Sequence, residues 1–377
     1  MSLSRQQVCE LTSKKLAAAA PSLKSMKSLI GLDGFVDNII AVVDKRQDAD
    51  HYDPVKTIEH FGKKICAAAG QSSNYELVVT QQKLGGNGPI MANALASFGI
   101  DVTYIGNLGF PAIHPVFDEF AKRATCISIA EPGYTDALEF EDGKLMLGKH
   151  GTLGDVSWDN IISRVGEKKL KELVGQSKLV GMVNWTMLPH MSRIWAKLLD
   201  DVIPNVERHE RKFFVDLADP EKRTHDDILE ALKLLTRFQD QVDVILGLNL
   251  KESVEVADVL GLPGQSDPEA HIEASARAIR EKLNLHCVVI HPRRGAAAAT
   301  KDESGSFQGP FVQQPKISTG AGDHFNAGFC LGRTLGFGIV ESLCTGVATS
   351  GYYVRSAISP SAVQLADFIA ELPPPQA

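Results

Sequence analysis

An alternation of short apolar runs with amphipathic stretches is the sequence feature that most limits the folds open to this chain. The apolar runs lie at residues 28–33, 101–106, 178–183, 212–216, 242–246 and 287–290. The stretches between them, at 158–173, 191–202, 225–238, 251–260 and 268–283, have the apolar spacing of helices. Such an alternation predicts a parallel sheet with helices on both faces. Because crossovers are right-handed, the carboxyl ends of the strands then share one edge, where ligands bind.

Two segments interrupt this alternation and predict a second, smaller sheet. Residues 74–80 have no helix between them and the next glycines, and residues 138–147 are centred on Asp142-Gly143, a dipeptide typical of hairpin turns. We therefore expect strands outside the main layer at about 35–45, 74–82 and 136–149. The expected organisation is a single domain over residues 1–377, with an N-terminal helical extension at residues 1–28.

Composition excludes several classes of protein. The chain has 377 residues, with 46 acidic and 39 basic side chains and a formal net charge of −7. A net acidic chain without a basic run predicts no nucleic-acid partner. No apolar stretch approaches the ~18 residues of a spanning helix, which predicts no membrane insertion. The six cysteines are scattered without a CxxC pair, as in a cytoplasmic protein with reduced thiols.

The most distinctive local sequence is a group of small residues just before an expected helix at residues 325–335. Gly320, Ala321 and Gly322 would leave backbone N–H groups unpaired at the helix start, where the helix dipole also favours an anion. Asp323 follows directly, and it would repel an anion unless it takes a hydroxyl proton during attack on phosphorus. In the alternative interpretation, Asp323 caps the helix and the glycines form a tight turn.

A second glycine cluster, Gly85-Gly86-Asn87-Gly88, precedes a helix expected at residues 89–98, with proline in its first turn. Such a loop lets a ligand approach the backbone, and Asn87 could hydrogen-bond a polyol. A plain strand-to-helix turn would explain the same residues. The chain has no GxxxxGK[ST] sequence, and this cluster lacks the third glycine of GxGxxG, which disfavours a Walker NTPase and a dinucleotide-binding dehydrogenase.

Taken in order, these segments resemble the phosphofructokinase-B/ribokinase family of carbohydrate kinases, over about residues 30–351. The first family signature corresponds to residues 85–99 and the second to residues 320–323, while Asn249-Leu-Lys-Glu252 corresponds to a third element, Asn-x-x-Glu. The resemblance implies a three-layer α/β/α sandwich with a small β-sheet lid. It also implies a kinase that uses ATP and Mg²⁺ to phosphorylate a hydroxyl group of a sugar or sugar-like acceptor.

The resemblance further implies roles for single residues. Asp323 would be the base that takes the acceptor's proton, and the amides of residues 320–322 would form the anion hole for the transferring phosphoryl group. Asn249 and Glu252 would arrange Mg²⁺ and its waters beside the nucleotide phosphates. For Glu252 the alternative is a solvated acid in the first turn of a helix.

The acceptor pocket implied by the resemblance contains Gly85, Gly86 and Asn87 together with Asp37 or Asp33. Asp37 matches the family's hydroxyl-binding aspartate better than Asp33 does. Other polar residues also follow strands at the ligand edge, with their roles left open. Asn184 and Trp185 could line the pocket or pack in the core, Asp216 could support the magnesium or the pocket, and Asp219 before a proline fits a cap.

The nucleotide side of the expected site departs from the family pattern. The family's Thr-x-Gly phosphate turn is replaced by a sequence ending in Arg293, Arg294 and Gly295. Either arginine could donate to nucleotide phosphates, although two solvated surface arginines would explain the sequence equally well. Thr345 lies where the adenine pocket would form.

Two further departures concern the cation and the acceptor. Ile317 occupies the position of an aspartate in members that use potassium, which disfavours activation by a monovalent cation. Ile90 replaces an asparagine of the first signature, which disfavours a ribose-like acceptor. An ADP-dependent sugar kinase, a nucleoside kinase and a non-catalytic sugar- or nucleotide-binding regulator remain alternatives. The free edges of the lid allow a homodimer, and a monomer with a covered lid is equally allowed.

Overall fold

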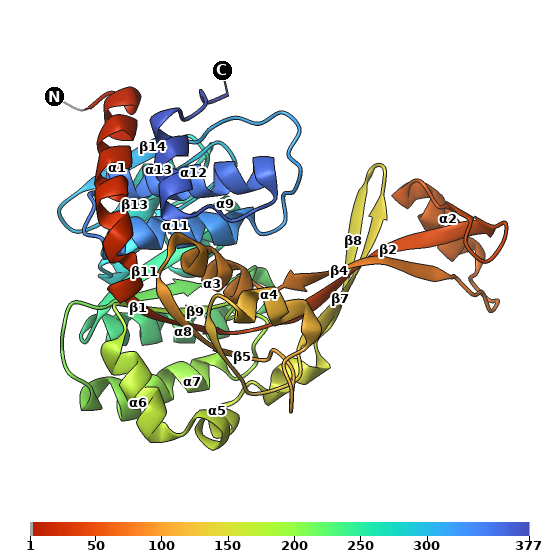
Figure 1. The fold of residues 1–377 in the computed structure, drawn as a ribbon, viewed down its shortest axis with the longest axis horizontal. Helices are drawn as coiled ribbons and strands as arrows, with labels where there is room; N and C mark the ends of the chain where they lie inside the picture. Colours follow the sequence, from red (N-terminus) through yellow and green to blue (C-terminus); the bar gives the residue numbers. More distant parts are fainter. Residues whose placement is uncertain (1–2, 377) are drawn as a thin grey trace.

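The computed structural model describes residues 3–376, so positions 1, 2 and 377 of the expected domain boundaries lie outside the described residues. The chain forms an α/β body from which a long arm of strands projects (Figure 1). Within residues 3–376, no helix combines the length and the apolar character needed to cross a membrane.

The body is built on a nine-stranded sheet in the order β14-β13-β12-β11-β10-β9-β1-β5-β6. Its strands from β12 to β6 are parallel, whereas β13 and β14 run antiparallel to their neighbours. The strands are β1 (Lys27–Leu32), β5 (Asp101–Gly106), β6 (Thr125–Ser128), β9 (Leu179–Val183), β10 (Lys212–Asp216), β11 (Asp243–Leu248), β12 (Cys287–Ile290), β13 (Gly295–Ala299) and β14 (Ser304–Gln308).

Helices cover both faces of this sheet, because successive side chains of each buried strand point to opposite sides. Leu29 and Phe213 pack on one face, and Ile30 and Phe214 pack on the other. The first face carries α5 (Trp158–Val165), α6 (Glu167–Gln176), α7 (Met191–Lys197), α8 (His225–Gln239), α9 (Leu250–Val259) and α10 (Ile272–Leu283). The second carries α1 (Arg5–Ala19), α3 (Asn87–Phe98), α4 (Asp118–Ala121), α11 (Ala321–Thr334), α12 (Ile339–Ser356) and α13 (Ala362–Ala370). The predicted three-layer α/β/α fold is confirmed.

The helix expected over residues 158–173 is instead two helices, α5 and α6. Gly166 separates them with a φ of 82°, a left-handed conformation that a glycine adopts without strain. The pair β13–β14 was not anticipated, because the alanine run at residues 296–299 carries no alternating pattern that would mark a strand.

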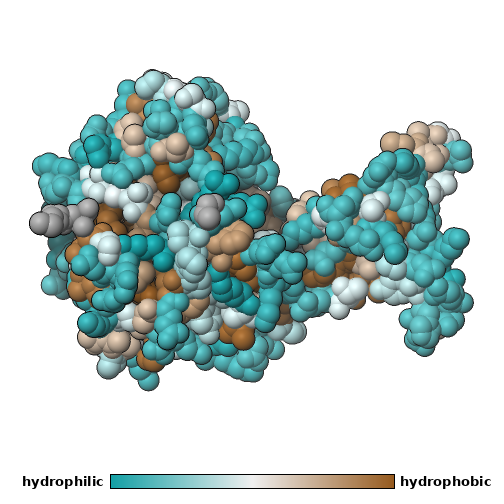
Figure 2. All heavy atoms as spheres, turned by 90° about the horizontal axis from the view of Figure 1, so that it is seen from above, coloured by the Kyte–Doolittle hydropathy of each residue, from teal (hydrophilic) through white to brown (hydrophobic). Residues whose placement is uncertain are grey.

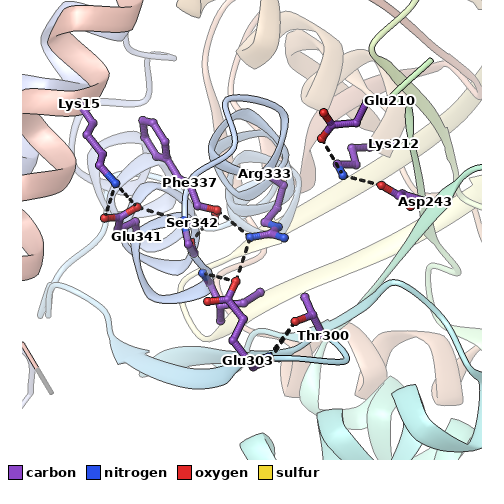
Figure 3. Close-up of polar contacts among 12 residues, drawn as sticks. Lys15, Glu210, Lys212, Asp243, Thr300, Glu303, Arg333, Phe337, Glu341 and Ser342 are labelled. Carbon is purple, nitrogen blue, oxygen red and sulfur yellow. Dashed lines mark hydrogen bonds and ion pairs between the residues drawn. The ribbon is translucent and has the colours of Figure 1, made fainter. Parts of the chain in front are cut away.

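The N-terminal helix α1 is packed into the body. It contacts α12 and α13, and Leu16 is fully buried in the core of that layer. Lys15 forms an ion pair of 2.7 Å with Glu341 on α12, which Figure 3 shows beside a second ion pair, of 3.5 Å, between Arg333 and Glu303. The contacts of α1 tie it to helices that follow the distinctive Gly320–Asp323 sequence.

The arm contains a five-stranded sheet and one helix (Figure 1). Its central strand, β2 (Phe35–Arg46), pairs in antiparallel orientation with β3 (Tyr52–Pro54) and β4 (Leu77–Gly85) and in parallel orientation with β7 (Gly133–Phe140). Ile40, Phe61 and Leu138 contribute to a small apolar core of its own. The elements are β2 (Phe35–Arg46), β3 (Tyr52–Pro54), α2 (Ile58–Ala67), β4 (Leu77–Gly85), β7 (Gly133–Phe140) and β8 (Gly143–Lys149).

Candidate active site

Polar residues gather at the edge of the sheet where the parallel strands end. Asp33 follows β1, Asn184 follows β9, Asp216 ends β10 and Asn249 follows β11. Helices α3 and α11 pack against each other, and each begins with one of the two glycine-rich loops. The parallel topology thus brings together residues that are far apart in the sequence.

Asp323 lies in the first turn of α11 and faces the other glycine-rich loop. Its Oδ1 accepts a hydrogen bond of 2.9 Å from the side-chain amide of Asn87. Only 8% of the residue is exposed. Burial raises the pKa of Asp323 to about 7, the charges of Asp33 and Glu252 also raise it, and the hydrogen bond from Asn87 lowers it. A carboxyl group with this pKa can accept a proton near neutral pH.

Two further buried carboxyl groups lie near Asp323. Asp216 accepts a hydrogen bond of 2.7 Å from Asn326 Nδ2, and burial together with the charge of Asp323 raises its pKa. Burial raises the pKa of Glu252, and the charge of Asp216 raises it further. This edge of the sheet therefore concentrates negative charge, which a bound cation would relieve.

The Asn249–Glu252 pair forms the N-terminal capping box of α9. Asn249 Oδ1 accepts from the backbone N–H of Glu252 at 3.0 Å, and Glu252 Oε2 accepts from the N–H of Asn249 at 2.8 Å. The other carboxylate oxygen of Glu252 accepts from the N–H of Asp219 at 2.9 Å. The alternative of a solvated first-turn acid is wrong, because only 3% of Glu252 is exposed.

The donor set at this edge fits magnesium held through water. Among residues 3–376, no three His, Cys, Asp or Glu side chains converge closely enough to enclose an ion. Magnesium keeps much of its water shell and needs few direct protein ligands. Asp216 and Glu252 are carboxylates of the type that orients such waters.

The loop before α11 has the conformation of an anion-binding turn. Gly320 is left-handed, with a φ of 87°, and stands at the N-cap of the helix. Within the described residues, the N–H groups of Gly320 and Gly322 have no hydrogen-bond acceptor, whereas the N–H of Ala321 donates to Ser318 O at 3.2 Å. A Cβ atom at Gly322 would lie 3.3 Å from the ring of His291, so that ring closes one side of the loop.

Asp33 has no exposed surface, and its carboxylate accepts three hydrogen bonds. The donors are the N–H groups of Asn87 (3.0 Å) and Gly88 (2.8 Å) and the side-chain amide of Asn184 (2.8 Å). Burial raises the pKa of Asp33 to about 6. The hydrogen bonds of Asp33 therefore anchor the start of α3.

Asp37 lies on β2, half-buried and facing Gly85. A Cβ atom at Gly85 would stand 2.5 Å from Asp37 Cγ, so the glycine makes room for this carboxylate. Burial raises the pKa of Asp37, while a hydrogen bond with Thr135 lowers it.

Thr345, expected near the adenine pocket, lies inside the helical layer. Its side chain is fully buried between α11 and α12, and its hydroxyl donates to Ser342 O at 2.8 Å. Trp185 is also a core residue, with its ring nitrogen bonded to Ser192. Arg293 and Arg294 are both exposed, beside half-buried Gly295, which leaves either arginine free to meet a ligand.

Several residues near the site were not among the sequence candidates. Asn326 lies one turn after Asp323 on the same helix face, a spacing that could have identified it. Lys144, at the start of β8, donates a hydrogen bond of 2.6 Å to Thr319 Oγ1, so the hairpin of the arm touches the loop before α11. No local signal in the sequence marks this contact.

Comparison with known proteins agrees with this architecture. A family model described as prokaryotic ketohexokinase matches residues 10–372. A ketohexokinase of Haloferax volcanii is 31% identical over 342 residues, which cover 90% of each chain. A mutant phosphofructokinase-2 from Escherichia coli shares the fold with a TM-score of 0.64 at 14% identity, covering 92% of this chain and 98% of its own. An Arabidopsis thaliana ribokinase has a TM-score of 0.61 at 16% identity, covering 91% and 98%.

Proposed function

The chain belongs to the prokaryotic ketohexokinase family and is a sugar kinase of the phosphofructokinase-B/ribokinase type, and we propose that it transfers the γ-phosphoryl group of ATP to a hydroxyl group of a ketohexose. The observation that carries this proposal is the contact between Asn87 and Asp323. It joins the loop at residues 85–88, which we propose binds the acceptor, to the helix start at residues 320–322, which we propose binds the phosphoryl group. The Arabidopsis relative was solved with ribose and ATP, and this supports ATP as the donor.

In the proposed mechanism, Asp323 accepts the proton of the attacking hydroxyl. As the oxygen–phosphorus bond forms, the bond from the γ-phosphorus to the bridging oxygen breaks and ADP leaves. The amides of the loop at residues 320–322 bind the transferring group, and Ala321 exchanges its 3.2 Å bond to Ser318 for this contact. Asp37 and Asn87 hydrogen-bond the hydroxyl groups of the sugar.

Mg²⁺ bound with the nucleotide would neutralise phosphate charge during the transfer. Asp216, Glu252 and Asn249 would hold this ion through water. Arg293 or Arg294, with the adjoining backbone at Gly295, contacts the nucleotide phosphates. The pKa values of Asp216 and Glu252, both raised by burial, support a cation at this edge, because a bound divalent charge would favour their ionised forms.

An acceptor and donor screen tests this function. Ketohexoses, aldohexoses, ribose and nucleosides are offered with ATP or ADP, with and without Mg²⁺, and the phosphorylated product is quantified directly. We expect the highest kcat/KM with a ketohexose, ATP and Mg²⁺. Turnover confined to nucleosides, turnover with ADP as the preferred donor, or binding without turnover would each contradict the proposal.

We also propose that the arm forms a homodimer contact. Figure 2 shows apolar side chains at the surface of the arm. The exposed apolar residues of its strands include Leu77 and Val79 on β4 and Met146 and Leu147 on β8. Sedimentation velocity should give a dimer that V79E dissociates. The matched control V363E changes a similarly exposed valine on α13 and should leave the dimer intact. A monomer at micromolar concentration contradicts this part of the proposal.

A further inference from the structure

Two aromatic side chains lie directly behind the anion-binding loop. His324 follows Asp323 in the first turn of α11 and is almost fully buried. Its Nδ1 lies 2.8 Å from Gly320 O, and its ring stacks on Tyr353 with centroids 3.6 Å apart and planes 12° apart. The hydroxyl group of Tyr353, on α12, donates to Thr319 O at 3.1 Å.

The hydrogen-bond partners define which nitrogen of His324 carries the proton. Burial lowers the pKa of His324 to about 4, so the ring is neutral near neutral pH. A carbonyl oxygen only accepts, so Nδ1 must donate to Gly320 O. Nε2 must then accept, and Ser359 Oγ lies 2.8 Å from it.

The donors behind Ser359 continue in the same direction. Asn93 Nδ2 lies 3.4 Å from Ser359 Oγ, and Arg123 donates to Asn93 Oδ1 at 3.1 Å. The series of hydrogen bonds therefore begins at the charged guanidinium of Arg123, passes through Asn93, Ser359 and His324, and ends at the carbonyl oxygen of Gly320. Chains of hydrogen bonds that point one way polarise each other.

Each of the two carbonyl groups shares a peptide unit with an amide of the anion-binding loop. Thr319 O belongs to the peptide that carries the N–H of Gly320, and Gly320 O belongs to the peptide that carries the N–H of Ala321. A hydrogen bond accepted by the carbonyl draws electron density from the N–H and makes it a stronger donor. It also fixes the plane of the peptide, and therefore the direction of the N–H.

We propose that His324 and Tyr353 are positioning residues that orient and polarise the peptides of residues 319–321 toward the transferring phosphoryl group. The inference rests on the proposed function, because it assigns a purpose to amides that bind that group. The two residues act from behind the loop and contact neither substrate. The competing explanation is that the stacked rings only pack α11 against α12.

Variants that separate hydrogen bonding from packing test this inference. H324N retains a side-chain N–H two bonds beyond Cβ, the place of Nδ1, whereas H324L fills the space without a donor. Y353F keeps the stacked ring and removes only the hydroxyl group. Y352F is the matched control, because the neighbouring tyrosine packs edge-on against Phe368.

We expect H324L and Y353F each to lower kcat by about tenfold. This loss is smaller than the roughly 10²–10³-fold loss of kcat that follows complete removal of an oxyanion donor. KM for sugar and for ATP should change less than about twofold, because the amides are engaged mainly in the transition state. H324N should recover most of the lost kcat, and Y352F should behave as the unaltered protein does.

A binding measurement provides a second readout that is independent of turnover. Thermal unfolding is followed with Mg²⁺, ADP and sugar, with and without aluminium fluoride as a mimic of the transferring group. The extra stabilisation by aluminium fluoride should shrink in H324L and Y353F, while stabilisation by ADP alone stays the same.

The inference is overturned if H324L and Y353F keep full kcat and the full aluminium fluoride effect in folded protein. It is also overturned if H324N is as impaired as H324L, since packing alone would then explain the loss. Failure of the proposed function has a different signature, in which the unaltered protein itself shows neither turnover of any sugar nor an aluminium fluoride effect.

Discussion

The side-chain amide of Asn87 donates a hydrogen bond of 2.9 Å to Oδ1 of Asp323, across 236 residues of sequence. The bond joins the first turn of α3 to the first turn of α11. The backbone N–H of Asn87 is itself bound to Asp33, at 3.0 Å. The two glycine-rich loops therefore hold each other in register, and a change in the loop of Asn87 should alter the position of Asp323, the proposed base.

Replacing the proposed base should uncouple binding from chemistry. D323N retains an oxygen that can accept from Asn87, so nucleotide-dependent thermal stabilisation should persist. Turnover should fall by a factor on the order of 10²–10⁴, because the variant cannot take the hydroxyl proton. D226N removes an exposed carboxylate in the first turn of α8 and serves as the control for loss of charge. Equal turnover in D323N would remove Asp323 from the mechanism.

The pH dependence should follow the ionisation of Asp323. With a pKa of about 7, the group is protonated and inactive as a base in acid, so kcat/KM for ATP should rise with pH and level off above neutrality. Because the bond from Asn87 favours the ionised form, N87A should move the midpoint to higher pH. The measurement is the pH profile of kcat/KM for ATP, at saturating sugar, for the unaltered protein and for N87A. An unchanged midpoint in N87A would contradict the assignment.

The sequence anticipated the two loops because each contains glycines just before a helix, a local signal with a direct physical meaning. The family resemblance drawn from those loops and from Asn249–Glu252 is confirmed by the family model and by the Haloferax ketohexokinase. The alternation of apolar runs likewise predicted the parallel strands of the sheet.

Residues whose importance arises only from tertiary contacts were harder to predict. Thr345 is buried where two helices cross, and a small residue on a helix gives no sign in the sequence of whether it lines a cavity or such a crossing. Asp33 and Asp37 are both acids near the end of one strand. Only the folded structure shows that the carboxylate of Asp33 is bound to backbone N–H groups, whereas that of Asp37 faces Gly85. The contact between Lys144 and Thr319 depends on how the arm folds back.

The acidic edge should make stability depend on pH and on magnesium. Asp216 has a raised pKa in the folded protein, so its ionisation destabilises the fold as pH rises from the ordinary aspartate range through the raised value. D216N should therefore raise the free energy of unfolding at pH 8, by on the order of 1–3 kcal/mol, and have little effect at pH 4. Asn326 Oδ1 is buried without a donor and can accept from the new amide after a flip.

Urea unfolding at both pH values, with and without Mg²⁺ and nucleotide, measures this effect. Added Mg²⁺ should stabilise the unaltered protein more at pH 8 than at pH 6, and it should stabilise D216N less. If D216N is destabilised equally at both pH values, then the carboxylate is a structural acceptor and not part of a cation site.

The last prediction concerns the room that Gly85 leaves for Asp37. In G85A the new Cβ atom would stand 2.5 Å from Asp37 Cγ, closer than real contacts allow, so the carboxylate must move. If Asp37 binds the sugar, KM for the sugar should rise about tenfold, equivalent to about 1.4 kcal/mol, while KM for ATP stays nearly constant. G62A on α2 is the matched control from the same arm, because a Cβ atom there meets no atom within 4 Å and should at most stabilise the helix. D37N should raise KM for the sugar in the same way, since it removes the carboxylate without displacing the loop. An unchanged KM in both G85A and D37N, with G62A behaving normally, would show that the acceptor is bound elsewhere.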